Sequence, residues 1–174
     1  KLINNKVKLI KSNITQNLKW VNKDNWHLTM KFLGEVNKDK IDDIMKAIDK
    51  AVNIEKFYFQ LDHIGAFPHL DHAKVIYLGI NRGENELINL YNNLENELYK
   101  INFDRDERKF TPHLTIARTK NNINYSQLST NIKTFIKNRD FINIYSQVKK
   151  ISLMKSELYP EGPKYKEIFT KKLK

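Results

Sequence analysis

Two short stretches decide how this sequence is interpreted: NWHLTMKFLGEV at residues 25–36 and FTPHLTIART at residues 110–119. Each contains the letters His-Leu-Thr inside an apolar run that is typical of a strand. Because successive side chains of a strand alternate between its two faces, His27 and Thr29 point the same way, at about 6.6 to 7 Å from each other. The first stretch therefore offers an imidazole and a hydroxyl to one surface, and its leucine points to the opposite one.

The second copy, with His113 and Thr115, changes the interpretation of the first copy. A single histidine in a strand is more often structural, and threonine is simply a good strand former. Two identical copies favour a shared site instead. Imidazole exchanges a proton near neutral pH, and a threonine hydroxyl can donate a hydrogen bond to a phosphate oxygen. Two such strands facing one another across a cleft would have the groups for in-line phosphoryl transfer without a metal.

Composition indicates a folded protein with a preference for polyanions. The chain has 174 residues, 40% of them hydrophobic, which suits one domain or two small lobes. A net charge of +11 favours partners such as RNA, although the abundance of Lys, Asn and Ile also fits an AT-rich genome. The chain has no cysteine, and neither a signal peptide nor a membrane-spanning run is visible. We expect a cytoplasmic protein that does not associate with membranes.

The apolar spacing predicts a mixed α+β protein. Helices are expected at residues 3–18, 38–52, 84–101 and 125–137. Strands are expected at residues 18–21, 26–33, 57–61, 73–80 and 113–119, followed by a closing pair at 148–158 and 164–173 around the turn YPEGP. Asn37 or Asp39 is the expected N-cap of the second helix, and residues 62–72 read as a loop. His27 and His113 lie half a chain apart, which suggests an internal duplication.

The stretches HLTMKFLGEV and FTPHLTIAR also resemble the paired signatures of the two-histidine (2H) phosphoesterases, and among these the RNA 2′,3′-cyclic phosphodiesterases once called 2′-5′ RNA ligases. The resemblance extends to GAFPH, to KVIYLGI and to the flanking Pro112 and Arg118, and covers most of the chain from about Leu18. It implies an α+β, bilobal, pseudo-twofold-symmetric 2H phosphoesterase fold, with two antiparallel sheets facing a central cleft and helices outside. Residues 1–174 would form a single domain of two interleaved lobes, and we expect a further strand ahead of residue 1.

The resemblance also implies roles for the two histidines and two threonines. His113 would be the proton acceptor that activates water, and His27 the proton donor to the leaving 3′ oxygen, so that the product is a 2′-phosphate. The roles of such near-symmetric histidines are exchangeable with substrate orientation. Thr29 and Thr115 would bind phosphate oxygens. Run backwards with a 5′-hydroxyl, the same site would make a 2′-5′ linkage.

Other polar residues are assigned less directly. Arg118 matches the family's arginine and suits phosphate by its charge and fork geometry. Strand parity opposes this role, since Arg118 should face away from His113 unless the strand ends or bulges there. Lys31 has the right parity, but a solvated surface lysine is the more common case. Trp20, Trp26 and Tyr159 are able to stack on a base, although core packing is favoured for both tryptophans.

One group of residues looks superficially like a metal site, and it is made up of Asp62, His63, His69, Asp71 and His72. Their spacing matches no ligand pattern, so we interpret them as loop residues. We expect no metal and no cofactor.

The expected partner is an RNA with a 2′,3′-cyclic phosphate terminus, tRNA halves among the candidates, and the expected state is a monomer. Two alternatives remain open at this stage. One is a non-catalytic nucleotide- or RNA-binding module, against which the intact histidines and threonines weigh. The other is the same chemistry on another substrate, such as a cyclic nucleotide-sugar phosphate or a 2′-5′ linkage.

Overall fold

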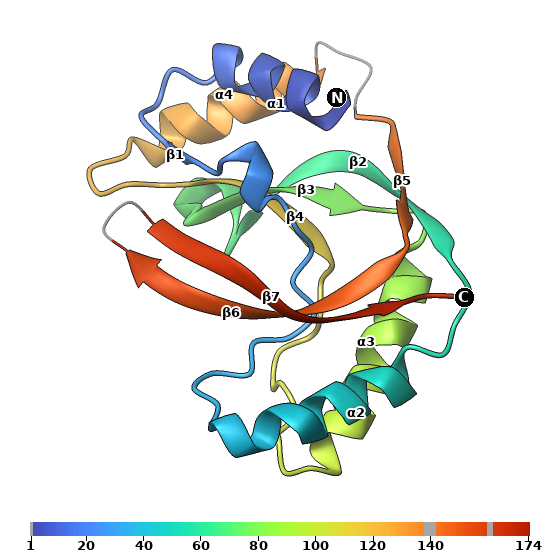
Figure 1. Cartoon of the computed structure of the whole chain (residues 1–174). Helices are drawn as coiled ribbons and strands as arrows, with labels where there is room; N and C mark the ends of the chain where they lie inside the picture. The colour runs from blue at the N-terminus through green and yellow to red at the C-terminus, as the bar shows by residue number, and fades with distance from the viewer. Residues whose placement is uncertain (1, 138–141, 160–161) are drawn as a thin grey trace. The chain divides into compact units, whose positions relative to one another are not determined.

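The computed structural model describes residues 2–137, 142–159 and 162–174 (Figure 1). Its α-helices are α1 (Leu2–Asn13), α2 (Ile41–Ala51), α3 (Glu84–Tyr99) and α4 (Tyr125–Lys137), and its short 3₁₀ turns are Lys23–Asn25, Lys38–Lys40 and Leu70–His72. Its strands are β1 (Lys19–Trp20), β2 (Phe57–Phe67), β3 (Val75–Ile80), β4 (His113–Arg118), β5 (Ile144–Val148), β6 (Lys150–Tyr159) and β7 (Gly162–Lys172). In this part of the chain no helix combines the length and hydrophobicity that a membrane crossing requires.

The chain divides into two compact units, each assembled from three separate segments. Unit 1 comprises Lys1–Thr29, Phe59–Arg82 and Pro112–Ser146. Unit 2 comprises Met30–Tyr58, Gly83–Thr111 and Gln147–Lys174. Both His-Leu-Thr motifs belong to unit 1.

The main sheet has the strand order β1-β4-β3-β2-β5, with antiparallel pairing from β1 through β4 and β3 to β2. One face of it is apolar and buried, and this face includes Ile64, Ile76, Leu78 and Leu114. In the same unit α1 packs beside α4, and both helices bury the apolar side that their spacing predicts. Polar side chains lie on the opposite face of the sheet, which we call the polar face.

In unit 2, α2 packs along α3 next to the β6–β7 hairpin (Figure 1). The core between the two helices consists of aliphatic residues at helical spacing, among them Ile44, Ile48, Leu90 and Leu94. The antiparallel pair of β6 and β7 confirms the predicted closing strands. The turn predicted at YPEGP falls in part on residues 160–161, which lie outside the described residues.

A charged cluster is buried inside unit 2. Lys31 Nζ lies 2.5 Å from Glu95 Oε1 and 3.1 Å from Asp106 Oδ1, and the side chains of Lys31 and Glu95 are only 6% and 4% exposed. Burial alone would lower the pKa of Lys31, but the hydrogen bonds and charges of Glu95 and Asp106 outweigh it and raise this pKa. Burial, together with the same two carboxylates, also raises the pKa of Tyr91 well above its ordinary value. The interpretation of Lys31 as a solvated surface residue is therefore wrong.

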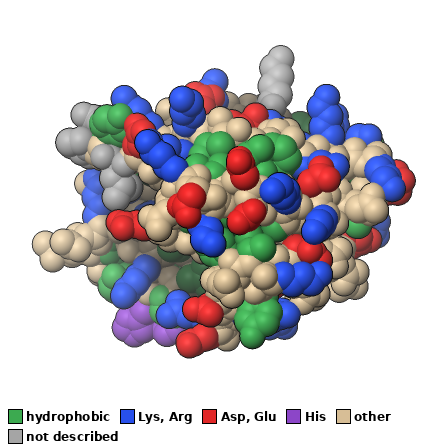
Figure 2. Space-filling model, turned by 60° about the horizontal axis from the view of Figure 1, so that its bottom comes forward, with side chains coloured by type: hydrophobic (Ala, Val, Ile, Leu, Met, Phe, Trp, Pro, Cys, Tyr) green, Lys and Arg blue, Asp and Glu red, His purple; other side chains and the backbone are tan. Residues whose placement is uncertain are grey.

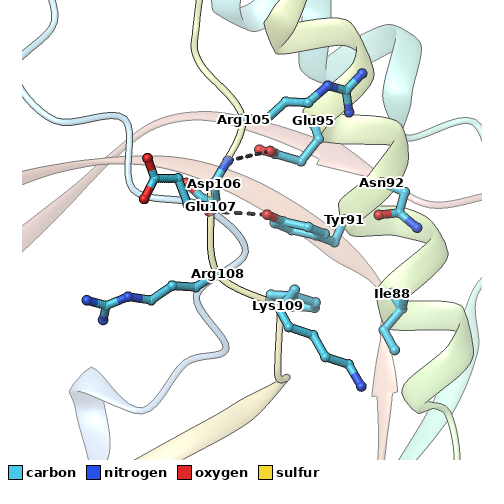
Figure 3. A pocket seen from close by; sticks show the side chains of 10 residues that line it. Ile88, Tyr91, Asn92, Glu95, Arg105, Asp106, Glu107, Arg108 and Lys109 are labelled. Atoms are coloured by element: carbon cyan, nitrogen blue, oxygen red, sulfur yellow. Dashed lines mark hydrogen bonds between the residues drawn. The ribbon is translucent and has the colours of Figure 1, made fainter.

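Figure 3 shows the connector that follows α3 folding back onto the helix at this cluster. The Asp106 amide donates to Glu95 Oε2 at 2.9 Å, and the Tyr91 hydroxyl donates to Asp106 Oδ2 at 3.2 Å. Tyr91 also stacks on Phe110, with 4.3 Å between ring centroids. The residues that make these contacts line part of a cavity of about 320 Å³. Their contacts hold the connector after α3 against the helix.

The largest difference from the predicted strands concerns residues 26–33, of which only Leu28 joins a ladder. The expected strand is absent because its apolar residues after Leu28, Met30 and Leu33, pack against the core of unit 2 instead of extending the sheet. The first helix also ends earlier than expected, at Asn13, whose side-chain amide caps the Leu9 carbonyl.

Three further expectations need correction. Residues 62–67 are not loop but the second half of β2, since they pair with β3 up to Pro68. Neither Asn37 nor Asp39 caps α2 with its side chain, because the turn Lys38–Lys40 leads into the helix through backbone hydrogen bonds. Strand β5 was not predicted. The helices α2, α3 and α4 and the strands β3 and β4 agree with the prediction to within a few residues.

Charge is dispersed on the face drawn in Figure 2, where Lys and Arg side chains lie among Asp and Glu. The net charge of +11 is therefore not gathered into one patch on that face.

The buried ion pair leads to a first prediction. Lys31→Met keeps the length of the side chain and removes its charge, so that Glu95 stays buried without a cation. We expect the free energy of unfolding to fall by about 3 kcal/mol in urea denaturation. The control is Lys46→Met, which removes an exposed lysine 3.8 Å from Asp43 and should cost less than about 1 kcal/mol. Equal losses in the two variants would contradict a stabilising role for the buried pair.

Candidate active site

Strand β4 carries the second motif on the polar face of the sheet. His113 pairs with Gly79 of β3, and Thr115 pairs with Tyr77, so the two side chains share one face. The imidazole of His113 packs against the rings of Phe67 and Tyr77, at 4.9 and 5.1 Å between centroids. These two rings stack on each other at 4.5 Å. His113 is therefore held in place by an aromatic pair.

The first motif is joined to the second by a single antiparallel bridge, between Leu28 and Leu114. The neighbours of a bridged residue project to the opposite face from it, so both motifs present their histidine and threonine to the same side. Antiparallel pairing around this bridge sets His27 on the side of Thr115 and Thr29 on the side of His113. We expected two strands facing across a cleft. The structure instead sets the motifs side by side within unit 1.

The exposed His27 side chain is oriented by the turn that precedes it. Its Nδ1 lies 2.7 Å from the carbonyl oxygen of Asn25, the last residue of the turn Lys23–Asn25. A carbonyl only accepts, so Nδ1 carries the proton and donates it to this oxygen. Asn22 supports the turn by accepting from the Asp24 amide at 3.1 Å.

A bulge in β4 resolves the parity objection to Arg118. The ladder with β3 shifts register after Thr115, so that Ile116 is an extra residue. Ile116 and Ala117 both turn toward the buried face, where each is fully buried. Arg118 then returns to the face of Thr115 and His113, and its side chain is exposed. The bulge is the exception under which Arg118 was expected to share the face of His113, so strand parity does not oppose its proposed role.

Arg118 also has basic neighbours that sequence analysis did not single out. Lys19 pairs with it across β1. A hollow of about 570 Å³ at this end of β4 is lined by Arg118 together with Lys74, Lys120 and Tyr125. Only the sheet register brings these lysines together, because they come from three distant parts of the chain.

Strand β2 adds a polar pair to the same face. His63 pairs with Gly79, after a register shift that makes Asp62 the extra residue of β2. His63 Nδ1 lies 2.5 Å from Asp62 Oδ1. Sequence analysis assigned residues 62–72 to a loop, and the bulge at Asp62 breaks the alternation that would have indicated a strand here.

The remaining residues of the metal-like group lie apart from this pair. His69 and His72 contact each other edge to face at 5.1 Å between centroids. The Asp71 carboxylate accepts from the Ser129 hydroxyl at 2.8 Å, and this bond and the charge of Lys133 lower its pKa. Among the residues that the structure describes, no three His, Cys, Asp or Glu side chains come together as metal ligands.

That Trp20, Trp26 or Tyr159 stacks on a base remains a prediction. Trp20 and Trp26 are half-buried. Tyr159 is 43% exposed, and Lys164 Nζ lies 4.4 Å from its ring centroid. A ring already covered by a cation would have to be uncovered before it stacked on a base.

Solved structures identify the fold. The protein TT0787 of Thermus thermophilus aligns with a TM-score of 0.79 and 20% identity, over 98% of this chain and 91% of that one. Escherichia coli LigT, complexed with 3′-AMP, aligns with a TM-score of 0.74 and 22% identity over the same shares. These likenesses confirm the α+β class and the 2H phosphoesterase fold that the sequence predicted.

The family follows from sequence comparison. The family model of the 2′-5′ RNA ligase superfamily matches residues 7–159. An RNA 2′,3′-cyclic phosphodiesterase of Methanocaldococcus jannaschii is 35% identical over 87% of this chain and 82% of its own length. A protein of the same name from Thermotoga maritima is 34% identical over 86% and 76%. The chain belongs to the 2′-5′ RNA ligase superfamily, and it is a phosphodiesterase.

Close packing on the polar face leads to a second prediction. A methyl group at Gly65 would collide with the ring of Tyr77, which stacking on Phe67 holds in place. Gly→Ala in an open strand is normally favourable, but here we expect Gly65→Ala to lower the free energy of unfolding by about 1–3 kcal/mol. In a Tyr77→Ala background the same change should be neutral or stabilising, as a double-mutant cycle in urea would measure. A cost that persists without the Tyr77 ring would contradict this packing.

Proposed function

We propose that this enzyme hydrolyses the 2′,3′-cyclic phosphate ends of RNA to 2′-phosphates without a metal ion. The observation that carries the proposal is the bridge between Leu28 and Leu114, which brings two histidines and two threonines to one face. The names of the relatives in Methanocaldococcus jannaschii and Thermotoga maritima support the substrate class. The net charge of +11 suits a polyanionic substrate, for which tRNA halves are candidates.

Three side chains would bind the cyclic phosphate. The hydroxyls of Thr29 and Thr115 each donate to a non-bridging oxygen. Arg118, on the same face as Thr115, adds a positive charge and a planar fork of donors. Negative charge builds up on the phosphate oxygens as water attacks, so these donors stabilise the transition state more than the ground state.

The two histidines would carry the proton transfers. His113 accepts a proton from water as the water oxygen attacks phosphorus. The bond from phosphorus to the 3′ oxygen breaks, and His27 donates a proton from Nε2 to that oxygen. The products are a 2′-phosphate and a 3′-hydroxyl, and each histidine ends in the protonation state in which the other began. In-line attack needs the two imidazoles on opposite sides of the phosphate.

No step of this scheme asks for a metal, because one imidazole supplies the base and the other the acid. Ligation needs only a 5′-hydroxyl in the place of water. His113 accepts the proton of the 5′-hydroxyl as its oxygen attacks phosphorus, the bond from phosphorus to the 3′ oxygen breaks, and His27 protonates that oxygen, so that two RNA ends are joined by a 2′-5′ linkage beside a 3′-hydroxyl. We propose this ligation as a slow side activity of the chain, which acts as a monomer.

A third prediction tests the proton-transfer pair. His27→Ala and His113→Ala should each reduce kcat/KM on an oligonucleotide with a 2′,3′-cyclic phosphate by about 10²–10⁴-fold, measured in EDTA. The wild-type product, separated from its 3′ isomer, should be the 2′-monophosphate, and the pH profile should be bell-shaped. His72→Ala is the matched control, since His72 is exposed and outside the proposed site. Activity in EDTA that survives both substitutions would rule out the mechanism.

A fourth prediction concerns Arg118. Arg118→Met should raise KM for the same substrate by about tenfold, the value of a charge-assisted contact to phosphate. Arg118→Lys should recover only part of this loss, because lysine has no planar fork. The side chain is exposed, so the urea midpoint should stay unchanged in both variants. Full activity of Arg118→Met would remove this residue from the phosphate site.

A further inference from the structure

One histidine on the polar face has no part in the mechanism above. His63 of β2, Gly79 of β3 and His113 of β4 form one rung across three neighbouring strands. Their side chains project to the same side. Two histidines of one sheet are thus separated only by a glycine.

The missing side chain of Gly79 is what lets His63 reach over β3. A Cβ atom built at Gly79 would collide with the His63 imidazole, and Nε2 is the ring atom nearest to it. The ring therefore lies over Gly79, on the side of its own strand that leads to His113. Nδ1, at the other edge of the ring, is bound to the Asp62 carboxylate at 2.5 Å.

Asp62 is placed for this contact by the bulge in β2. An extra residue turns two successive side chains toward one face, here Asp62 and His63. The carboxylate accepts from Nδ1, so Nε2 is the ring nitrogen directed over the surface of the sheet. A protonated imidazole is a charge-assisted donor to phosphate through its Nε2–H.

A purely structural role would be to cover a glycine with an aromatic ring, as Tyr77 covers Gly65 on the adjacent rung. The two rings differ in their surroundings. Tyr77 is 9% exposed and stacks on Phe67. The side chain of His63 is 53% exposed and has a carboxylate as its partner. Covering a glycine requires neither exposure nor charge.

We propose that His63 binds the internucleotide phosphate on the 5′ side of the terminal nucleotide of the substrate. This inference rests on the proposed function. The side chains of β4 and of the segment around Leu28 would bind the cyclic phosphate. His63 lies on β2, two strand spacings or about 10 Å from His113, and its ring covers part of that distance. An RNA that continues across β3 from the terminal ribose presents its next phosphate on this side.

The test compares two substrates that differ in that phosphate. Cytidine 2′,3′-cyclic monophosphate lacks it, and the dinucleotide ApC with a 2′,3′-cyclic phosphate has it. His63→Ala should raise the ratio of the dinucleotide KM to the mononucleotide KM by about tenfold. The effect should fall on KM and not on kcat, since the contact is made equally in the ground and transition states. His72→Ala should leave the ratio at its wild-type value.

Two more variants separate a substrate contact from a structural one. Gly79→Ala removes no polar group but displaces the His63 ring, so it should raise the same ratio. Asp62→Asn should give a smaller rise, because Asp62 acts through His63. Circular dichroism and urea midpoints confirm that each variant is folded.

The possible outcomes are distinguishable. A ratio that stays at the wild-type value in both His63→Ala and Gly79→Ala, with or without a loss of stability, would overturn the inference and leave the proposed function standing. Wild-type enzyme that hydrolyses neither substrate would overturn the proposed function and the inference together.

Discussion

The pairing of Leu28 with Leu114 is the contact on which the proposed site depends. Leu114 is buried on the apolar side of the sheet, and the half-buried Leu28 is bridged to it, so the flanking histidines and threonines project to the other side. The hydrophobic effect that stabilises the sheet thus also sets the orientation of the polar groups. A shift of this pairing by one residue would turn His27 and Thr29 toward the apolar side, away from His113 and Thr115, whose orientation the pairing of β4 with β3 sets.

Two irregularities refine the arrangement. The extra residue in β4 brings Arg118 to the face of Thr115, and the extra residue in β2 places Asp62 beside His63. Each bulge interrupts the ladder by one residue and re-aims a charged side chain. Gly65 and Gly79 contribute in another way, because the space above their backbones is occupied by the rings of Tyr77 and His63. The absence of a side chain at these two glycines therefore shapes the polar face as much as the side chains around them do.

In unit 2, buried charged side chains stabilise the packing of a segment. Lys31 follows the first motif by only a few residues, yet it is buried against Glu95 and Asp106 and fastens the connector after α3. Removing one member would leave an uncompensated charge in the interior, which is why such a group holds its segment firmly. A lysine close to a His-Leu-Thr motif in the sequence is thus structural, whereas the distant Lys19 and Lys74 lie beside Arg118.

The sequence by itself determined the α+β class, the amphipathic helices and the two His-Leu-Thr motifs, because these depend on local periodicity and on residue types at short spacing. His27 and His113 were recognisable since their surroundings repeat. The face of Arg118 stayed open because strand parity fails at a bulge. His63 was wrongly assigned to a loop, and Lys31 to the surface, because strand pairing and burial depend on partners far along the chain. Only the tertiary structure decided which faces these side chains share, because register between distant strands is set by packing of the whole sheet.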